Sequence, residues 1–373
     1  MLNVLRLRVP RSSSSRLNPT VGVSAVIAVC VLLASTLSAQ LPPLSPAHLN
    51  PAIEKLASGK PIYGVLTQDI SRENARALGR RDTDFVFIDM EHSPFNMDGI
   101  SSFVAAMNDK AYTVKKGAQP RSALFVRMPP YASENAAWVV KQALDIGVMG
   151  FVFNTVETKE QAEAAVKSMR YPPWKAFPNT RKGPVGIRGW SPGGAVWAWG
   201  VETEEYRRRA DVWPLNPEGD LMAIMIIETA EGVKNVDAIA QVPGVTALSA
   251  AAGGDLSSSF GVPANAPEVE AARQSILRAC LKHNVVCWIS PTNKADLDRR
   301  MKEGWRMFRT SNGLPEEAAT ATARSRPRIA TGRALRWARR TCARTAACRR
   351  CRCGRRSCRQ GLSALPGPSR HRR

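Results

Sequence analysis

The sequence predicts an α/β fold in which eight parallel strands close into a (β/α)8 barrel. Three observations predict it. Short apolar segments alternate with amphipathic helical segments, eight such apolar segments occur between residues 61 and 309, and polar residues gather where several of them end. In a barrel of this kind the active site lies at the carboxyl ends of the strands. The pattern therefore indicates where chemistry takes place.

The expected elements follow in chain order. Strands are predicted at 61–66, 85–89, 123–127, 149–153, 222–228, 245–251, 285–289 and 305–309. Helices are predicted at 71–79, 97–108, 134–146, 157–169, 231–241, 268–282 and 294–303. The stretch 171–220, rich in Pro, Gly and Trp, is expected to be an irregular functional loop.

Charge divides the 373-residue chain into parts. The net charge is +22, but residues 316–373 hold 17 Arg against 2 Glu, residues 1–40 hold 4 Arg and no acid, and only +3 remains between them. We assign the barrel to residues 53–315. Because little net charge remains there, we expect the barrel not to bind nucleic acid. Cys280 and Cys287 are too few for a disulfide framework and are predicted to be core residues.

The N-terminal segment, residues 1–39, has the order of a secretory signal peptide. Basic residues precede an uncharged apolar run at 21–37, and small residues near Ala39 suggest a cleavage site, which predicts an exported (periplasmic or secreted) protein. An uncleaved membrane anchor and an organellar transit peptide are the alternatives, and a cytoplasmic location is a further one. Residues 40–52 are predicted to be a Pro-rich linker.

The C-terminal segment, residues 316–373, changes composition abruptly. From residue 318 onward it contains no acid and no lysine, and Arg, Ala and Cys dominate. We interpret it as a disordered, low-complexity tail and hypothesise a frameshifted reading of the gene. A nucleic-acid or membrane-surface tail is the functional alternative.

Charged residues at the ends of the second and third strands can support acid–base chemistry. His92 follows Asp89 and Glu91 and can act as a general base, or it can hydrogen-bond to Asp89 and only shape the loop. Arg127 ends an apolar run, where a guanidinium suits a substrate carboxylate or a developing enolate. A structural salt bridge to Asp89 or Glu91 is the alternative for Arg127.

Two carboxylates near the ends of the fifth and sixth strands, Glu228 and Asp255, suit a hard divalent cation. Each of them precedes a helical segment, so helix capping is the alternative interpretation for both.

Several ordered motifs resemble the HpcH/HpaI aldolase/citrate lyase family of metal-dependent 2-keto-acid aldolases. The resemblance covers roughly residues 50–312 and rests on IDMEHSP at 88–94, RMPP at 127–130, QALDIGVMG at 142–150, RYPP at 170–173, GIRGW at 186–190, IIETAEGVKN at 226–235 and GGDLSSSFG at 253–261. It implies an oligomeric barrel of the phosphoenolpyruvate/pyruvate-binding type. The implied reaction cleaves a 4-hydroxy-2-keto acid to pyruvate, or a related keto acid, and an aldehyde.

The resemblance also implies roles for individual residues. Glu228 and Asp255 are the expected ligands of Mg²⁺ or Mn²⁺, with Co²⁺ as a further candidate. Arg127 is expected to steady the enolate and keto oxygen, and His92 to be the acid/base. The remaining expected site residues are Asp145, which supports the histidine, Asp89 and Glu91, which orient it or hold water, and Gly254, which binds substrate together with Glu91 and Arg127.

The resemblance also allows two other functions. A lyase acting on a malyl- or citramalyl-CoA thioester is one alternative, and a non-catalytic keto-acid-binding homologue is another. Ile226 stands where the family usually has Gln, which removes a polar contact beside the expected metal site.

Overall fold

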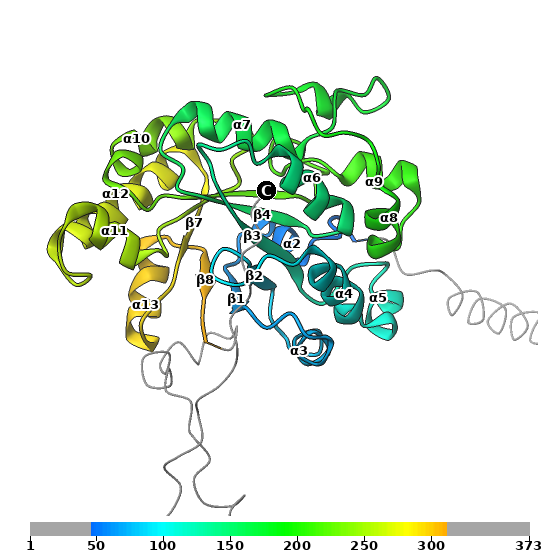
Figure 1. The fold of residues 1–373 in the computed structure, drawn as a ribbon, viewed down its shortest axis with the longest axis horizontal. Helices are drawn as coiled ribbons and strands as arrows, with labels where there is room; N and C mark the ends of the chain where they lie inside the picture. The colour runs from blue at the N-terminus through cyan, green and yellow to red at the C-terminus, as the bar shows by residue number, and fades with distance from the viewer. Residues whose placement is uncertain (1–45, 312–373) are drawn as a thin grey trace, which may run out of the picture. The chain divides into compact units, whose positions relative to one another are not determined.

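Eight parallel strands close into one barrel, β1 to β8 in sequence order, in the computed structural model of this chain. The structure describes residues 46–311. Helices surround the strands on the outside, so the predicted (β/α)8 fold is confirmed (Figure 1). The predicted signal peptide and the predicted tail lie outside the described residues. Within those residues, no helix has both the length and the apolar character needed to cross a bilayer.

The strands are β1 (Ile62–Thr67), β2 (Phe85–Asp89), β3 (Ala123–Tyr131), β4 (Gly150–Asn154), β5 (Met222–Ile226), β6 (Ala247–Ser249), β7 (Val286–Ile289) and β8 (Met307–Arg309). The helices are α2 (Pro51–Ala57), α3 (Arg72–Leu78), α4 (Met97–Met107), α5 (Lys110–Lys115), α6 (Ala137–Ile146), α7 (Lys159–Met169), η1 (Pro178–Arg181), α8 (Gly193–Trp199), α9 (Thr203–Arg209), α10 (Ala230–Ala240), α11 (Gly253–Phe260), α12 (Pro267–His283) and α13 (Lys294–Glu303).

All eight predicted strands and all seven predicted helices occur, with small differences at their ends. β5 ends at Ile226 and β6 at Ser249, so Glu228 and residues 250 and 251 belong to the loops that follow. The stretch 171–220, predicted to be irregular, contains η1, α8 and α9. The long connection between α7 and β5 therefore contains helices of its own.

Aromatic rings fill the inside of the barrel. Phe85 stacks on Phe125 with ring centroids 5.3 Å apart, and Trp288 meets Phe85 and Phe87 edge-on at 6.0 and 5.2 Å. A Cβ atom at Gly64 would come within 2.2 Å of the Phe85 ring, so only glycine leaves room for that ring. Because side chains alternate along a strand, these rings place Asp89 and Arg127 on the inner face at the barrel mouth.

The segment before α2 belongs to the barrel, which corrects the predicted boundary of the linker at residue 52. His48, Leu49 and Asn50 are buried. The Asn50 side chain accepts hydrogen bonds from the backbone N–H groups of Ala52 and Ile53 and so caps α2, and its Nδ2 donates to the carbonyl of Asp220. The barrel therefore includes residues that composition alone assigned to a linker.

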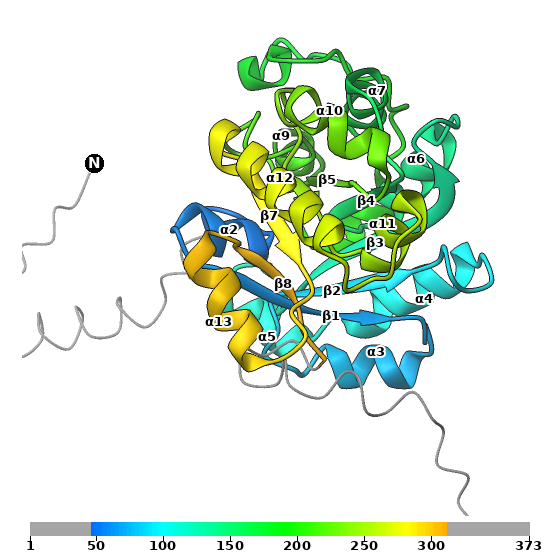
Figure 2. The same cartoon turned by 90° about the vertical axis from the view of Figure 1, so that its left-hand side faces the viewer.

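A disulfide joins Cys280 on α12 to Cys287 on β7. Both residues are buried, as predicted for core cysteines, but the bond between them was not predicted. The Cys287 sulfur lies 3.7 Å from the carbonyl oxygen of Ile276 on α12. α12 lies beside β7 (Figure 2), so the bond ties the helix to the barrel wall.

Candidate active site at the carboxyl ends of the strands

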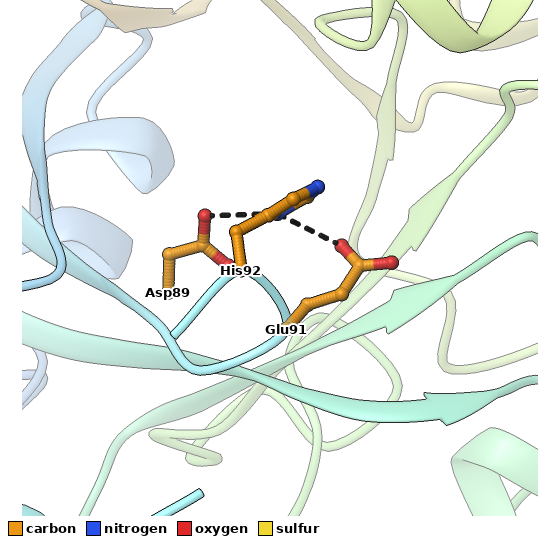
Figure 3. A group of neighbouring side chains, drawn as sticks. All are labelled: Asp89, Glu91 and His92. Atoms are coloured by element: carbon orange, nitrogen blue, oxygen red, sulfur yellow. Dashed lines mark hydrogen bonds and ion pairs between the residues drawn. The ribbon is translucent and has the colours of Figure 1, made fainter. Parts of the chain in front are cut away.

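Arg127 is the centre of the first group of site residues. Its Nε and one terminal nitrogen donate to the two carboxylate oxygens of Asp89 at 3.0 and 2.8 Å. Its other terminal nitrogen lies 2.7 Å from Glu91 Oε2. His92 Nδ1 lies 3.2 Å from Asp89 Oδ2 and 3.5 Å from Glu91 Oε2 (Figure 3). The structure therefore brings Asp89, Glu91, His92 and Arg127 together, as predicted.

The salt bridge weighed for Arg127 is present, and it holds the guanidinium in a fixed position at the barrel mouth. Burial by itself would raise the pKa of Asp89, but the hydrogen bonds and charge of Arg127 outweigh it and lower that pKa. Burial raises the pKa of Glu91 despite the nearby guanidinium. Glu91 Oε2 is buried and accepts no well-aligned hydrogen bond, although Arg127 lies at ion-pair distance. Glu91 is therefore the less satisfied of the two carboxylates.

Glu228 forms the second group, two residues beyond the end of β5. Its side chain is buried, and Oε1 accepts hydrogen bonds from the backbone N–H and the hydroxyl of Thr155 at 2.7 and 2.6 Å. The N-cap of α10 is Thr229, so Glu228 does not cap that helix. Burial raises the pKa of Glu228, and the charges of Asp255 and Glu91 raise it further.

Asp255 lies in the first turn of α11 and is exposed. The N-cap residue of α11 is Ala252, and the Asp255 side chain forms no hydrogen bond or ion pair with residues 46–311. Capping therefore explains neither Asp255 nor Glu228. Gly254, the neighbouring predicted substrate-binding residue, faces open space, since an added Cβ would meet no atom within 4 Å.

Two sets of side chains at this end of the barrel are candidates for holding a metal ion. Ligand atoms of Asp89, Glu91 and His92 lie within 4.8 Å of one another. The Arg127 guanidinium already supplies a positive charge to that set. Glu228 and Asp255 have no cationic partner among the described residues, and their charges repel each other. Electrostatics therefore favours the second set for a divalent cation, with Glu91 close enough to raise the pKa of Glu228.

Asp145 does not join these residues within the chain. It lies on α6, and its two carboxylate oxygens accept hydrogen bonds from Lys141 at 2.5 Å and from Arg188 at 2.6 Å. The predicted support of His92 comes instead from Asp89. Asp145 of the QALDIGVMG motif is therefore paired with Lys141 and Arg188 and not with the residues at the barrel mouth.

The sequence reasoning missed three further polar residues at the barrel mouth. Thr155 holds Glu228, Gln68 donates to the His92 carbonyl at 3.3 Å, and Asn154 donates to the carbonyl of Met128 at 2.6 Å. Asn154 is fully buried, and its Oδ1 has no hydrogen-bond partner in the described part of the chain. Gln68 and Thr155 directly follow β1 and β4, and Asn154 is the last residue of β4; these places at strand ends were the available signal.

Comparison with known proteins finds the family that the sequence motifs resemble. The model of the HpcH/HpaI aldolase/citrate lyase family matches residues 69–308. A hydroxypyruvate/pyruvate aldolase of Paraburkholderia phytofirmans is 29% identical over 261 residues, which is 69% of this chain and 90% of the relative. A 5-keto-4-deoxy-D-glucarate aldolase of Escherichia coli is 31% identical over 244 residues, 65% of this chain and 81% of the relative.

A solved structure extends the comparison to the fold. An HpcH/HpaI aldolase/citrate lyase family protein of Burkholderia cenocepacia superimposes with a TM-score of 0.53 at 28% identity, over 67% of this chain and 87% of that protein. The matched region contains every strand from β2 to β7 and all the predicted site residues, from Asp89 to Asp255. This chain therefore belongs to the HpcH/HpaI aldolase/citrate lyase family and is a carbon–carbon lyase.

Proposed function

We propose that the enzyme cleaves a 4-hydroxy-2-keto acid to pyruvate, or a related keto acid, and an aldehyde, with a divalent cation as cofactor. The observation that carries the proposal is the meeting of three carboxylates, Glu91, Glu228 and Asp255, which repel one another next to the fixed guanidinium of Arg127. Holding three ionised carboxylates so close together is electrostatically unfavourable unless a cation binds between them. All the atoms that the group offers to a metal ion are carboxylate oxygens, which suit a hard divalent cation.

Glu228 and Asp255 would hold the cation, for which Mg²⁺ and Mn²⁺ are the first candidates and Co²⁺ the third. Glu228 Oε1 is already occupied by Thr155, which leaves Oε2 available. A bound divalent cation supplies Lewis-acid polarisation of a 2-keto oxygen.

Arg127 stabilises negative charge on the keto acid. Asp89 fixes the guanidinium through two hydrogen bonds, so that its orientation is set before substrate arrives. As the C3–C4 bond breaks, its electron pair moves toward the keto group and forms an enolate. A positive charge held nearby stabilises that enolate more than it stabilises the substrate.

His92 is suited to move the proton. Its side chain is 56% exposed, and Nδ1 faces Asp89, so Nε2 is the nitrogen open to substrate. His92 Nδ1 also lies 2.8 Å from a terminal nitrogen of Arg127, so the tautomer of the ring decides which contact is a hydrogen bond. In the tautomer whose Nδ1–H is donated to Asp89, Nε2 can accept the proton of the C4 hydroxyl, and the hydroxyl oxygen becomes the aldehyde oxygen. The protonated ring can then return that proton to C3 of the enolate, and this completes the keto acid.

The test is pyruvate release from a panel of 4-hydroxy-2-keto acids by the full chain. We expect EDTA to abolish release and added Mn²⁺ or Mg²⁺ to restore it. Glu228→Gln should lower kcat/KM by about 1000-fold or more, because it removes the charged ligand. The matched control is Glu231→Gln, which alters an exposed carboxylate on α10. Folded protein that releases no pyruvate with any metal, but cleaves malyl-CoA, would replace this proposal with the thioester-lyase alternative.

We propose further that the enzyme acts after export, as the order of basic, apolar and small residues in segment 1–39 predicts. The Cys280–Cys287 disulfide supports export, since disulfides persist mainly in oxidising compartments. Mass spectrometry of protein from an exporting host should find a mature N-terminus near residue 40. An intact leader in soluble cytoplasmic protein would contradict this proposal.

We also propose a homo-oligomer. Trp197 on α8 is 86% exposed and Val114 on α5 is 75% exposed, which is unusual for such large apolar side chains. Val114 borders a mostly apolar cavity of about 270 Å³ at the amino ends of β3 and β4. Light scattering should give a multiple of the chain mass, and Trp197→Glu should reduce it. A monomeric wild-type protein would refute the proposal.

A further inference from the structure

The β7–β8 side of the barrel mouth presents three hydrogen-bond donors. Trp288 pairs with Met307 in the sheet, and its ring lies against Phe87 inside the barrel. Ser290 comes two residues after Trp288, and Arg309 comes two residues after Met307. Because side chains alternate, they occupy the next inner-facing positions.

These donors have no acceptor within residues 46–311. Trp288 is 1% exposed, and its Nε1 forms no hydrogen bond. Ser290 Oγ is also buried without a partner, and the Arg309 guanidinium forms neither a hydrogen bond nor an ion pair with residues 46–311. Buried donors are nearly always satisfied in native proteins. Two buried, unsatisfied donors beside a guanidinium that has no partner among residues 46–311 therefore point to an acceptor that the described part of the chain does not supply.

The charge of Arg309 makes that acceptor an anion. Burial lowers the pKa of Arg309, and the like charge of Arg127 lowers it further. The negative charge of Asp89 acts in the opposite direction and raises the pKa of Arg309. Both carboxylate oxygens of Asp89, however, already accept hydrogen bonds from Arg127. A bound anion would pair with Arg309 and accept hydrogen bonds from its neighbours.

The two sides of the mouth therefore have opposite character. Glu228 and Asp255, after β5 and β6, gather negative charge, whereas the β7–β8 side carries the positive charge of Arg309 beside the unsatisfied groups of Trp288 and Ser290. Arg127, on β3, lies within electrostatic range of Arg309. A substrate whose keto-acid end lies at Arg127 and the carboxylate pair can extend its other end toward β8.

We propose that Arg309, Ser290 and Trp288 form an anion subsite that binds a carboxylate on the aldehyde portion of the substrate. The enzyme then selects dicarboxylic 4-hydroxy-2-keto acids over those with a neutral aldehyde portion. The selectivity rests on the proposed aldolase function, whereas the subsite can be tested by binding alone.

The binding test compares two keto acids of equal chain length, 2-ketoglutarate and 2-ketopentanoate, which differ in one terminal carboxylate. Calorimetry on the full chain with Mn²⁺ should show that 2-ketoglutarate binds about 10-fold or more tightly than 2-ketopentanoate. Arg309→Met should bring the two affinities within about 2-fold without changing that for 2-ketopentanoate. Arg309→Lys should retain part of the difference.

Controls separate the subsite from general charge and from folding. Arg299→Met removes the same charge from the outer face of α13, where Arg299 is half exposed, and should leave the difference unchanged. Ser290→Ala is a milder change that tests the same subsite if Arg309→Met fails to fold, and it should weaken 2-ketoglutarate binding about 3-fold.

Equal binding of the two keto acids by the wild-type protein would overturn the proposal. An equal loss of affinity for both keto acids in Arg309→Met would also overturn it. If the difference emerges only after Glu316 and Glu317 are changed to Gln, the chain's own carboxylates occupy the subsite, and the proposal also fails.

The cleavage test uses 4-hydroxy-2-ketoglutarate and 4,5-dihydroxy-2-ketopentanoate, in which CH₂OH replaces the second carboxylate. Arg309→Met should lower kcat/KM for the first by about 100-fold and for the second by less than about 3-fold. Loss of both to the same extent would overturn the selectivity. If the wild-type protein cleaves neither, the aldolase proposal fails, and the binding comparison still decides whether the subsite exists.

Discussion

Thr155 holds Glu228 from a backbone conformation that is rare for its residue type. Its φ is 49°, in the left-handed region that β-branched residues seldom adopt. This conformation directs both its N–H and its hydroxyl at Glu228 Oε1. Such strain persists only where the surrounding structure compensates for it, and it is frequent at functional sites. Thr155 is therefore a positioning residue for the expected metal ligand.

Removal of the Thr155 hydroxyl should loosen that ligand. Thr155→Val keeps the shape of the side chain but loses one hydrogen bond, and we expect about 10-fold weaker Mn²⁺ binding and a similar fall in kcat/KM. Thr155→Ser keeps the hydroxyl and should stay within about 3-fold of wild type. Calorimetry measures the affinity. If Val and Ser have the same effect, the hydroxyl does not position Glu228.

Glu228→Gln should stabilise the metal-free protein even as it abolishes activity. Gln retains an oxygen for Thr155 but removes a buried charge that Asp255 and Glu91 repel. The pKa of Glu228 is raised by burial, so its contribution to stability is full below the ordinary pKa of a glutamate and is lost as pH rises through the raised value. Thermal melts in EDTA should show a wild-type Tm that falls over this pH range and a flatter variant. At pH 7–8 the variant Tm should be higher by about 2 °C or more.

A single sequence predicted the site residues whose position depends on strand order alone. Asp89, Arg127 and Glu228 lie at or just beyond strand ends, and the alternation of strands and helices was enough to place them at one end of the barrel. Arg309 and Thr155 were missed because their importance depends on which side chains face them across the mouth. Sequence spacing carries no information on such contacts.

The connection from α7 to β5 is organised around one buried arginine. Arg170 is 1% exposed and donates two hydrogen bonds to Asp211, at 2.6 and 2.9 Å. It also donates to the carbonyls of Thr180, Lys182 and Pro184. The arginine of the RYPP motif therefore closes a long loop on itself.

Arg170→Met should destabilise the protein by about 3–5 kcal/mol, because it leaves Asp211 buried without its partner. The control Arg170→Met/Asp211→Leu removes both charges and should recover a large part of that loss. Urea unfolding measures both variants. If the single and the double change cost the same, the ion pair does not hold the connection.

The helices inside this connection could not be predicted from local pattern. α8 begins with Gly193 and Gly194, which disfavour a helix, and no side chain caps it. It is held by packing instead, since Trp199 is buried and its Nε1 donates to the carbonyl of Gly147 at the end of α6. That contact joins residues 52 positions apart, beyond the reach of a periodicity argument.

At the scale of the whole molecule, the chain before α2 closes the amino end of the barrel. Asp220 is fully buried and receives hydrogen bonds from the Asn50 backbone N–H at 3.1 Å and from Arg209 at 3.1 Å. His48 Nδ1 lies 3.3 Å from the same carboxylate. Composition suggested a linker here because proline dominates it, but burial is decided by these distant partners.

A chain that begins at residue 53 should therefore be less stable than one that begins at residue 46. The shorter chain lacks the Asn50 cap and leaves Asp220 with fewer partners, at a cost of about 3 kcal/mol or more. Comparison of their urea midpoints tests this, and equal midpoints would contradict it. Asn50→Ala in the full chain isolates the contribution of the cap and the buried hydrogen bonds.

The Cys280–Cys287 bond also links the protein to the electrons around it. The cysteines are seven residues apart, and closing so short a loop contributes about 2–3 kcal/mol. The cytosolic glutathione pool, poised at about −220 to −260 mV by extraction, keeps most protein thiols reduced. Because both cysteines are buried, alkylation is carried out in denaturant without reductant. Peptide mass mapping should then find both cysteines unlabelled in exported protein and both labelled in protein retained in the cytosol. The oxidation state of this link between helix and strand thus records the compartment in which each molecule folded.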